Sequence, residues 1–290
     1  MKNSVGYRVF KAGNFAYLSL IALCMFLPFL IILSVSFSSE AAVTKFGYSL
    51  FPRELSLDAY RFVFSAGTMG SGYIVSVIVT LAGTVLAVVI TALAGYALSR
   101  KNLKYRNFFA LAFYFTMVFN GGLVPWYIIV TRLGLKDSLW ALIIPMCFNP
   151  FNMLLIRNFF QTLPDALVES AKLDGAGEFK TFIRIIIPIS LPGLATITLF
   201  YMLGYWNDWW LALNFIDNEK LYPLQFLLRK ILSNISYAAS GMATTFNIAT
   251  IPQETVKMAT CVVTIGPIIL IYPFVQRYFI KGITVGAVKG

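Results

Sequence analysis

The sequence contains no histidine and few charged residues, which make up 12% of its 290 positions against roughly a quarter in soluble domains. Without histidine, histidine-containing catalytic triads, general-base histidines and most zinc sites are excluded. Cysteine is also scarce: Cys24, Cys147 and Cys261 lie in separate hydrophobic runs without C-x-x-C spacing, so we predict no disulfide and no metal. No G-x-x-x-x-G-K-[ST] motif is present, so the chain does not bind ATP by that route.

What the sequence has in abundance is long apolar stretches, since 59% of its residues are hydrophobic and its mean hydropathy is +0.77. This composition predicts an all-α integral membrane protein. Six runs approach the roughly 20 residues that a membrane-spanning helix needs. They cover residues 16–37, 73–98, 108–130, 139–156, 190–215 and 258–279.

The first hydrophobic run has two interpretations, because Lys2, Arg8 and Lys11 precede it as in a secretory signal peptide. Its predicted length of 22 residues exceeds the roughly 7–15 apolar residues of a cleaved signal. We therefore expect a retained first span.

The distribution of basic residues predicts the orientation of these spans. With the amino terminus inside, the cytoplasmic segments hold 14 of the 23 Lys and Arg, and the outer segments hold 9, spread over longer loops. The positive-inside rule therefore places both termini in the cytoplasm. The 9 outer bases face 7 acids, so the net charge of +11 gives no strong case for an anionic substrate and none for nucleic acid.

The longest polar passage between two hydrophobic runs in the second half covers residues 163–192. Pro164 and Asp165 suit the first turn of a helix, and Gly175 supplies the positive-φ freedom that ends one. A second helix is predicted to begin near Glu178. Its apolar stripe consists of Phe179, Phe182, Ile183, Ile186 and Ile187.

Part of this passage matches the EAA loop pattern of ABC importer permeases, which reads E-A-A, three residues, Gly, nine residues, then I-x-L-P. The matching residues are Glu169, Ala171, Gly175, Ile185 and Pro188, with Ser170 in place of the second-position Ala and Ile187 in place of Leu. The chain resembles the carbohydrate branch of that family, the maltose-type permeases, from its first hydrophobic segment to its last residues. Its carboxyl terminus, QRYFIKGITVGAVKG, looks like the tail of the maltose-type second permease subunit.

This resemblance implies the type I importer fold, with six spans in a single domain over residues 1–290 and a cytoplasmic coupling helix within residues 163–188. It implies that the coupling residues contact an ATPase subunit; these are Glu169, Ser170, Ala171, Asp174, Gly175, Ile185 and Pro188. It also implies that the tail reaches the ATPases through Lys281, Gly282, Gly286 and Lys289. On local pattern alone, an ordinary solvated loop at the membrane interface is the alternative.

Two of the predicted spans contain residues that interrupt a helix. In the third, Asn120, two glycines and Pro125 predict a bent or locally unwound segment. In the fourth, Asn149 and Asn152 place polar groups toward the inner half. Packing is one explanation for such breaks, and lining a substrate pathway is the other.

The fifth span contains an aromatic and polar run from Tyr205 to Trp210, in which Asp208 is the only carboxylate of any predicted span. Aromatic residues of this kind are typical of the membrane interface, which would put Asp208 at the outer rim. The alternative is a sugar contact, with rings stacked on a pyranose and polar groups bound to its hydroxyls. On that hypothesis the pathway residues of this run are Tyr205, Trp206, Asn207 and Asp208.

The sequence therefore predicts a multi-pass permease of the bacterial cytoplasmic (inner) membrane, without enzymatic activity or cofactor of its own. The resemblance implies a homologous second permease, two ATPase subunits that hold ATP and Mg, and an extracytoplasmic solute-binding protein. The pattern FNGGLVPWYIIVTRLGLKDSLWALIIP, residues 119–145, resembles permeases for pectin- or alginate-type oligosaccharides. An ABC permease for a non-sugar solute, or a secondary transporter, is the alternative; the latter would need more intramembrane ionisable residues.

Overall fold

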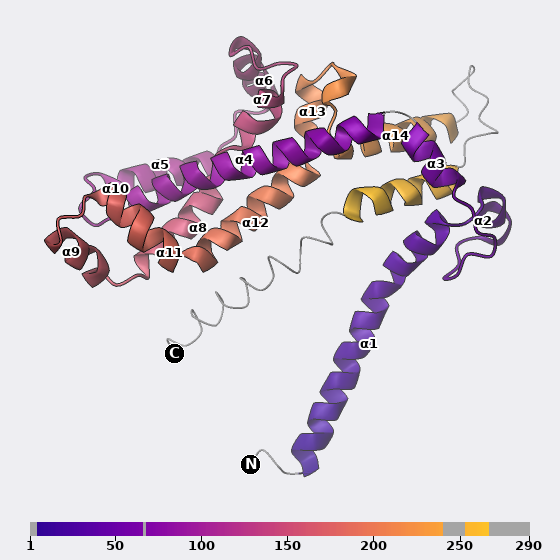
Figure 1. Ribbon diagram of the computed structural model, residues 1–290, viewed down its shortest axis with the longest axis horizontal. Coiled ribbons are helices and arrows are strands. Elements are labelled where there is room, and N and C mark those ends of the chain that lie inside the picture. Colours follow the sequence, from indigo (N-terminus) through magenta and orange to yellow (C-terminus); the bar gives the residue numbers. More distant parts are fainter. Residues whose placement is uncertain (1–4, 66–67, 240–252, 267–290) are drawn as a thin grey trace. The chain divides into compact units, whose positions relative to one another are not determined.

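The computed structural model describes residues 5–65, 68–239 and 253–266, and the regular secondary structure within these ranges is helical (Figure 1). The β-type pairing found there is a lone bridge between Ser38 and Leu55. The prediction of an all-α chain is therefore confirmed for this part of the sequence.

Among the described residues, two helices are long and apolar enough to cross a membrane unbroken. They are α1 (Val5–Ser36) and α4 (Thr68–Ser99), which cover the first two predicted spans. A helix over residues 253–266 includes the start of the predicted sixth span, whose remainder lies outside the described residues. The described ranges support two to five spans, so the expected total of six stays a prediction.

Three further segments pass the same test of length and apolarity only as bent pairs of helices. The first pair is α5 (Arg106–Val118) and α6 (Leu123–Arg132), which meet at 112°. This bend confirms the prediction that the third hydrophobic run is interrupted. The second pair, bent by 48°, joins α7 (Leu139–Ile143) and the 3-10 turn Ile144–Met146 to α8 (Pro150–Gln161).

The third bent pair joins the polar passage to the fifth predicted span. A short helical stretch, made of α10 (Glu178–Thr181), the π-helical turn Phe182–Ile186 and α11 (Ile187–Ile189), meets α12 (Leu191–Asn207) at 84°. The helix then stops at Asp208 and resumes as α13 (Trp210–Phe215), so the fifth predicted span is divided as well.

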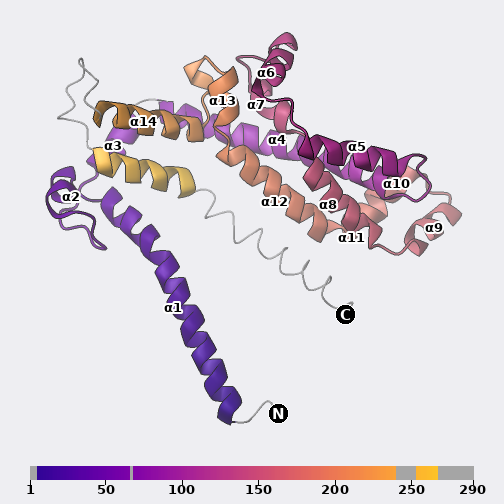
Figure 2. The same cartoon turned by 180° about the vertical axis from the view of Figure 1, so that it is seen from behind.

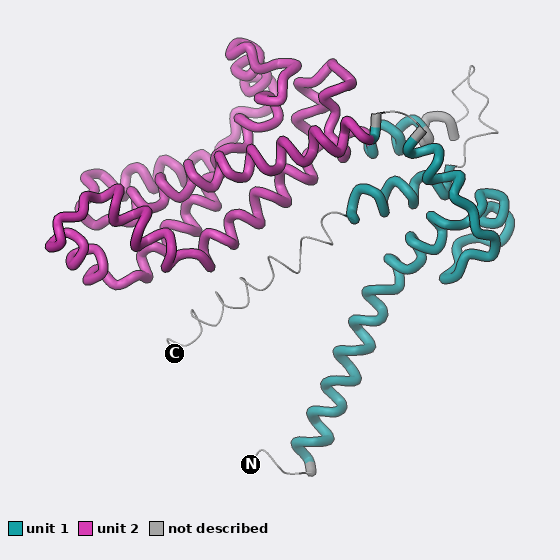
Figure 3. Tube along the Cα trace, viewed as in Figure 1, with its two compact units in different colours: residues 1–69, 228–266 teal, residues 70–227, 267–290 magenta. Residues whose placement is uncertain are grey.

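The chain separates into two compact units (Figure 3). Unit 1 comprises residues 1–69 and 228–266, and it contains α1, α2 (Glu40–Phe46), α3 (Asp58–Ser65) and the helix over 253–266. Unit 2 comprises residues 70–227 and 267–290. A 3-10 turn, Glu219–Leu221, precedes α14 (Leu224–Ala239), along which the chain passes from unit 2 to unit 1.

Within unit 1, Glu40 connects segments that are more than 200 residues apart in the sequence. Its carboxylate accepts hydrogen bonds from the backbone N–H groups of Glu254 and Thr255, at 3.0 and 2.9 Å, and from the Thr255 hydroxyl at 2.8 Å. An acidic side chain at a helix amino terminus satisfies N–H groups that have no partner within the helix. Glu40 therefore caps the helix that leads into the predicted sixth span.

Unit 2 is built along α4, with α8 between α5 and α12 in both views (Figure 1 and Figure 2). Gly83 of α4 allows a close approach, because a Cβ there would lie 2.5 Å from the ring of Tyr205 in α12. One buried cluster joins α4 to α6, α7, α12 and α13. A second, centred on Ile156 and Ile197, lies toward the end that carries α9 (Ala166–Leu173) and α10.

Candidate functional site

The centre of the candidate site is α9 and the turn that follows it. Its last turn closes with two bonds, from the Gly175 N–H to the Lys172 carbonyl and from the Ala176 N–H to the Ala171 carbonyl, at 3.0 and 2.9 Å. This is the Schellman arrangement, in which the residue after the cap takes a positive φ. Gly175 has φ +74°, so the helix, turn, helix prediction for this passage is confirmed.

The two faces of α9 have different environments. Val168 and Ala171 are buried within unit 2, whereas Glu169, Ser170 and Asp174 are exposed. Ala171 therefore packs the helix onto its own chain rather than offering a small surface to a partner. The exposed face presents two carboxylates and one hydroxyl.

Two large apolar side chains on either side of the turn are exposed. Leu173 is 89% exposed and Phe179 is 69% exposed. The predicted apolar stripe includes Phe179 and Ile183, and for both residues the prediction of burial was wrong. Ile183 lies within the π-helical turn Phe182–Ile186, where the regular helical spacing does not hold, whereas Phe179 precedes that turn. Phe182 and Ile186 alone of that stripe are buried. The exposure of Leu173 was not predicted from the sequence. The signal that could have indicated it is that Leu173 is apolar but lies off the apolar stripe of α9.

Beneath the turn, three aromatic rings anchor the loop to the membrane helices. Tyr96 of α4 lies 4.8 Å from Phe182 and 6.1 Å from Phe160, between ring centroids. The Tyr96 hydroxyl donates a 2.9 Å hydrogen bond to Glu178. Lys172 pairs with the other oxygen of that carboxylate at 2.6 Å. Glu178 thus ties α9 and α10 to α4.

The charges of these groups support the same arrangement. The hydrogen bond from Lys172 lowers the pKa of Glu178, which lies outside the predicted spans, although partial burial opposes this effect. At the start of α9, Lys101 contacts Asp165 at 2.6 Å and lowers the pKa of that carboxyl as well. Both carboxyls are therefore ionised at neutral pH, and the two ion pairs hold the ends of the loop.

The other predicted coupling residues, Ile185 and Pro188, follow α10 in the sequence. Ile185 is half-buried in the π-helical turn, and Pro188 is exposed at the start of α11. The tail residues Lys281, Gly282, Gly286 and Lys289 lie outside the described residues.

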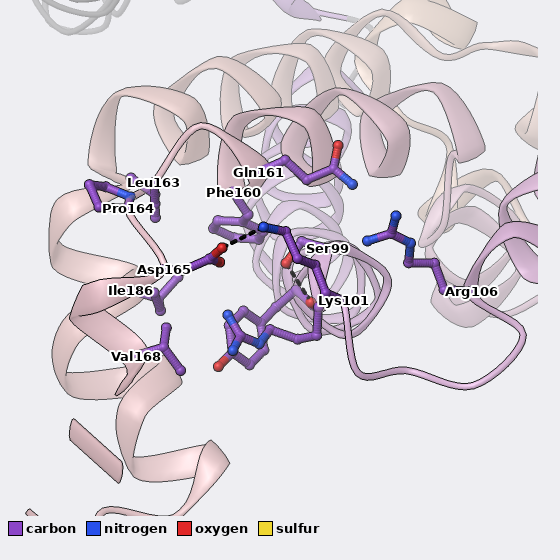
Figure 4. Close-up of a pocket in the computed structure, with 12 residues that line it drawn as sticks. Ser99, Lys101, Arg106, Phe160, Gln161, Leu163, Pro164, Asp165, Val168 and Ile186 are labelled. Carbon is purple, nitrogen blue, oxygen red and sulfur yellow. Dashed lines mark hydrogen bonds and ion pairs between the residues drawn. The ribbon is translucent and has the colours of Figure 1, made fainter. Parts of the chain in front are cut away.

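A cavity of about 270 Å³ opens next to the start of α9 (Figure 4). It lies where α4 and α8 end and α5 begins, between the segment 99–106 and the first residues of the loop. Its lining residues are Tyr96, Ser99, Arg100, Lys101, Arg106, Phe160, Gln161, Leu163, Pro164, Asp165, Val168 and Ile186.

Most of the predicted pathway residues have structural partners at breaks in the helices. Asn149 caps α8 by accepting from the N–H groups of Phe151 and Asn152, at 2.9 and 3.3 Å. Asp208 accepts from the Leu211 N–H at 3.1 Å and so begins α13. Tyr205 donates to the Ile143 carbonyl at 2.8 Å, where the 3-10 turn starts.

The remaining residues of this group are divided between interior and surface. Trp206 and Asn152 are buried. Asn207 is exposed, donates to the Leu203 carbonyl at 2.9 Å and accepts from Gln225 at 3.2 Å. The structure therefore does not bring the predicted pathway residues to one surface.

Asn120 is the exception, because it lines a second hollow of about 600 Å³ at the break between α5 and α6. Its side chain accepts from the Gly122 N–H at 2.8 Å. Two tryptophans, Trp126 and Trp210, share this lining with the break. The lining therefore combines two indole rings with one polar side chain, that of Asn120. The hollow lies on the α6 and α13 side of unit 2, away from α9 (Figure 1).

Comparisons with known proteins agree with this architecture. Residues 103–285 match the family described as binding-protein-dependent transport system inner membrane component. Protein LplC of Bacillus subtilis is 41% identical over 290 residues, covering 100% of this chain and 98% of the relative. The polygalacturonan/rhamnogalacturonan transport system permease protein YtcP of the same organism is 40% identical, with both chains covered in full.

A solved structure supports the fold directly. One chain of a bacterial ABC transporter involved in the import of the acidic polysaccharide alginate superimposes with a TM-score of 0.82 at 32% identity. The match covers 95% of this chain and 98% of that one.

Proposed function

The chain belongs to the family of binding-protein-dependent transport system inner membrane components, and on this premise we propose that it is the permease subunit of an ATP-driven importer for oligo- or polysaccharides. Acidic sugar chains are the favoured substrate class. Support comes from the full-length similarity to a polygalacturonan/rhamnogalacturonan permease and from the structural match to an alginate importer.

The proposed assembly contains a homologous second permease, two ATPase subunits and an extracytoplasmic binding protein. Six spans with both termini in the cytoplasm would place the loop of residues 163–188 beside the ATPases. The observation that best supports an ATPase contact is how α9 is held in the structure. Its inner face is buried, its turn is fixed by Gly175, and Leu173 is 89% exposed. A rigid helix with an exposed apolar tip is suited to a pocket on a partner.

The route by which such a contact would move the permease follows the chain. α10 and the π-helical turn lead through the 84° bend into α12. α12 ends at Asn207, three residues before Trp210, which lines the hollow. ATP-driven closure of the ATPases would shift α9, and α12 would transmit that shift to the hollow. Alternating access requires two such states of unequal affinity for the sugar.

We place sugar contact at the hollow formed by Asn120, Trp126 and Trp210. A pyranose ring has apolar faces that stack on indole, and its hydroxyls match the amide of Asn120. Trp210 is 42% exposed, which leaves part of its ring free for a ligand.

The test is ATP hydrolysis by the reconstituted complex with its binding protein, challenged with neutral α-glucan, pectic and alginate oligosaccharides. We expect pectic or alginate chains to stimulate hydrolysis. In the same assay, Trp210→Ala should lower stimulation but not basal hydrolysis, whereas Trp140→Ala, which removes an exposed tryptophan outside the hollow, should change neither. No stimulation by any sugar, with an active ATPase present, would contradict the carbohydrate assignment.

A further inference from the structure

The cavity beside α9 contains more positive charge than its own residues neutralise. Arg100, Lys101 and Arg106 line it, with Asp165 as the single acid of the lining. Lys101 uses that acid in its 2.6 Å ion pair. Two further guanidinium groups therefore line the cavity without a contact ion pair among the described residues. The charge of Arg100 acts on Asp165 and Glu178 from a longer distance.

Neither arginine has an acidic partner in hydrogen-bond contact among the described residues. Arg100 lies over the Tyr96 ring, 5.8 Å from its centroid, while the nearby Glu178 is occupied by Lys172 and Tyr96. Arg106 lies close enough to Arg157 for their charges to repel. An unpaired cluster of this kind attracts an anion, because bringing one in relieves the repulsion between like charges.

The neutral groups of the cavity add hydrogen-bond donors and an apolar wall. Figure 4 shows the side chains of Arg106 and Gln161 directed toward each other across the cavity, with Lys101 between them and its ammonium turned to Asp165. Phe160, Leu163 and Ile186 form the opposite side. The cavity therefore offers charged donors next to hydrocarbon, which complements the anionic acceptor of a lipid headgroup and the start of its acyl chain.

The position of the cavity sets the level at which a ligand would bind. The apolar helix α4 ends at Ser99, α5 begins at Arg106, and α8 ends at Gln161. The ends of membrane helices lie at the level of the lipid headgroups, and basic pockets there on the cytoplasmic side bind anionic lipids. With a volume of about 270 Å³, the cavity is at the lower end for ligand sites and suits a headgroup rather than a whole lipid.

We propose that this cavity binds the phosphate-bearing headgroup of an anionic membrane phospholipid, with Arg100 and Arg106 as its ligands. A lipid held there would lie against Asp165 and Val168 at the start of α9, so it would brace the coupling loop. The inference goes beyond the proposed function and rests on it only for placing this end of the helices on the cytoplasmic side.

The test measures retained lipid by native mass spectrometry on the purified importer complex titrated with phosphatidylglycerol or phosphatidylcholine. We expect phosphatidylglycerol to bind preferentially, and Arg100→Gln combined with Arg106→Gln to weaken its binding by about a hundredfold or more, since the loss of each charged hydrogen bond lowers the affinity by about tenfold or more. Arg106→Lys in the wild-type background should retain most of the binding. The matched control is Lys104→Gln, which removes a charge from the same exposed segment at a residue that does not line the cavity.

Three results would overturn the proposal: equal retention in the double variant and wild type, equal loss in Lys104→Gln, or displacement of the lipid by millimolar inorganic phosphate, which would indicate a site for free phosphate. The proposed function is judged separately, by whether the complex forms and hydrolyses ATP in phosphatidylcholine.

Discussion

In the turn that follows α9, Gly175 is the residue whose backbone conformation depends most directly on amino-acid type. Its φ of +74° is a conformation that costs other L-residues about 1–2 kcal/mol. A Cβ at this position would meet no atom within 4 Å among the described residues. Within the subunit, the cost of a substitution therefore comes first from backbone strain, and a further effect would come from a partner surface.

These facts separate two variants of Gly175. Asparagine tolerates positive φ, so Gly175→Asn should preserve the turn. Gly175→Val should destabilise the native conformation of the turn by about 1–2 kcal/mol, which lowers its population roughly tenfold. The variant should uncouple ATP hydrolysis from uptake while the spans stay folded. Transport and hydrolysis measured together in proteoliposomes check this, and undiminished transport in Gly175→Val would rule out the coupling role.

Leu173 and Phe179 allow a second prediction at this scale. Both are exposed at the tip, so Leu173→Ala and Phe179→Ala should change the stability of the subunit by no more than about 0.5 kcal/mol. If they anchor the ATPase, each should weaken its binding by more than about 1 kcal/mol. Co-purification in mild detergent and thermal unfolding give the two readouts.

Val168 provides the control for that pair. It is 2% exposed on the opposite face of α9, so Val168→Ala should reduce stability by about 1–2 kcal/mol through lost burial. Full ATPase retention in both tip variants would show that the apolar tip is not an anchor.

Among the elements, three breaks within hydrophobic segments share one feature: a polar side chain accepts a hydrogen bond from the backbone beyond the break. Asn120, Asn149 and Asp208 each accept backbone N–H groups just beyond a break. Breaks in a membrane helix are tolerated when nearby groups satisfy the freed backbone. The asparagines and the aspartate that resembled pathway residues in the sequence are, at most of these breaks, the caps of the next helix.

A substitution series at Asp208 tests this interpretation. An asparagine retains an acceptor oxygen, so Asp208→Asn should keep the cap, the folded amount and transport. Asp208→Ala removes the acceptor and should cost about 0.5–2 kcal/mol, seen as less folded subunit. Loss of transport in Asp208→Asn with normal folding would instead assign a functional role to the negative charge.

At the element scale, the sequence predicted the turn after α9 and the break in the third hydrophobic run well, because glycine, proline and cap residues act locally. It did not predict that Ile183 faces outward, because the regular helical spacing does not hold in the π-helical turn Phe182–Ile186. The exposure of Phe179, which precedes that turn, was not predicted either. It also did not predict the pairing of Lys101 with Asp165 or of Tyr96 with Glu178, because these join segments brought together only by packing. The capping role of Asn149 could not be predicted either, because it depends on the 48° bend that makes Pro150 the start of a new helix.

For the molecule as a whole, the proposed coupling depends on which side of the membrane each end of unit 2 faces. The loop with α9 and α10 lies at one end, and α6, α7 and α13 lie toward the other (Figure 1). The excess of Lys and Arg in the segments joined to the α9 end predicts that this end is cytoplasmic. ATP is available only on that side, so the proposed coupling requires the same orientation.

Single cysteines test that orientation. In a background with Cys24, Cys147 and Cys261 replaced by serine, we would place Lys104→Cys and Lys180→Cys at the α9 end and Lys220→Cys near α13; all three positions are exposed. A membrane-impermeant maleimide should label Lys220→Cys in intact cells, and the other two only after permeabilisation. The opposite pattern would put Leu173 and the Gly175 turn outside the cell, where an ATPase contact is impossible, and would remove the coupling role of α9 even if the fold and family assignment stood.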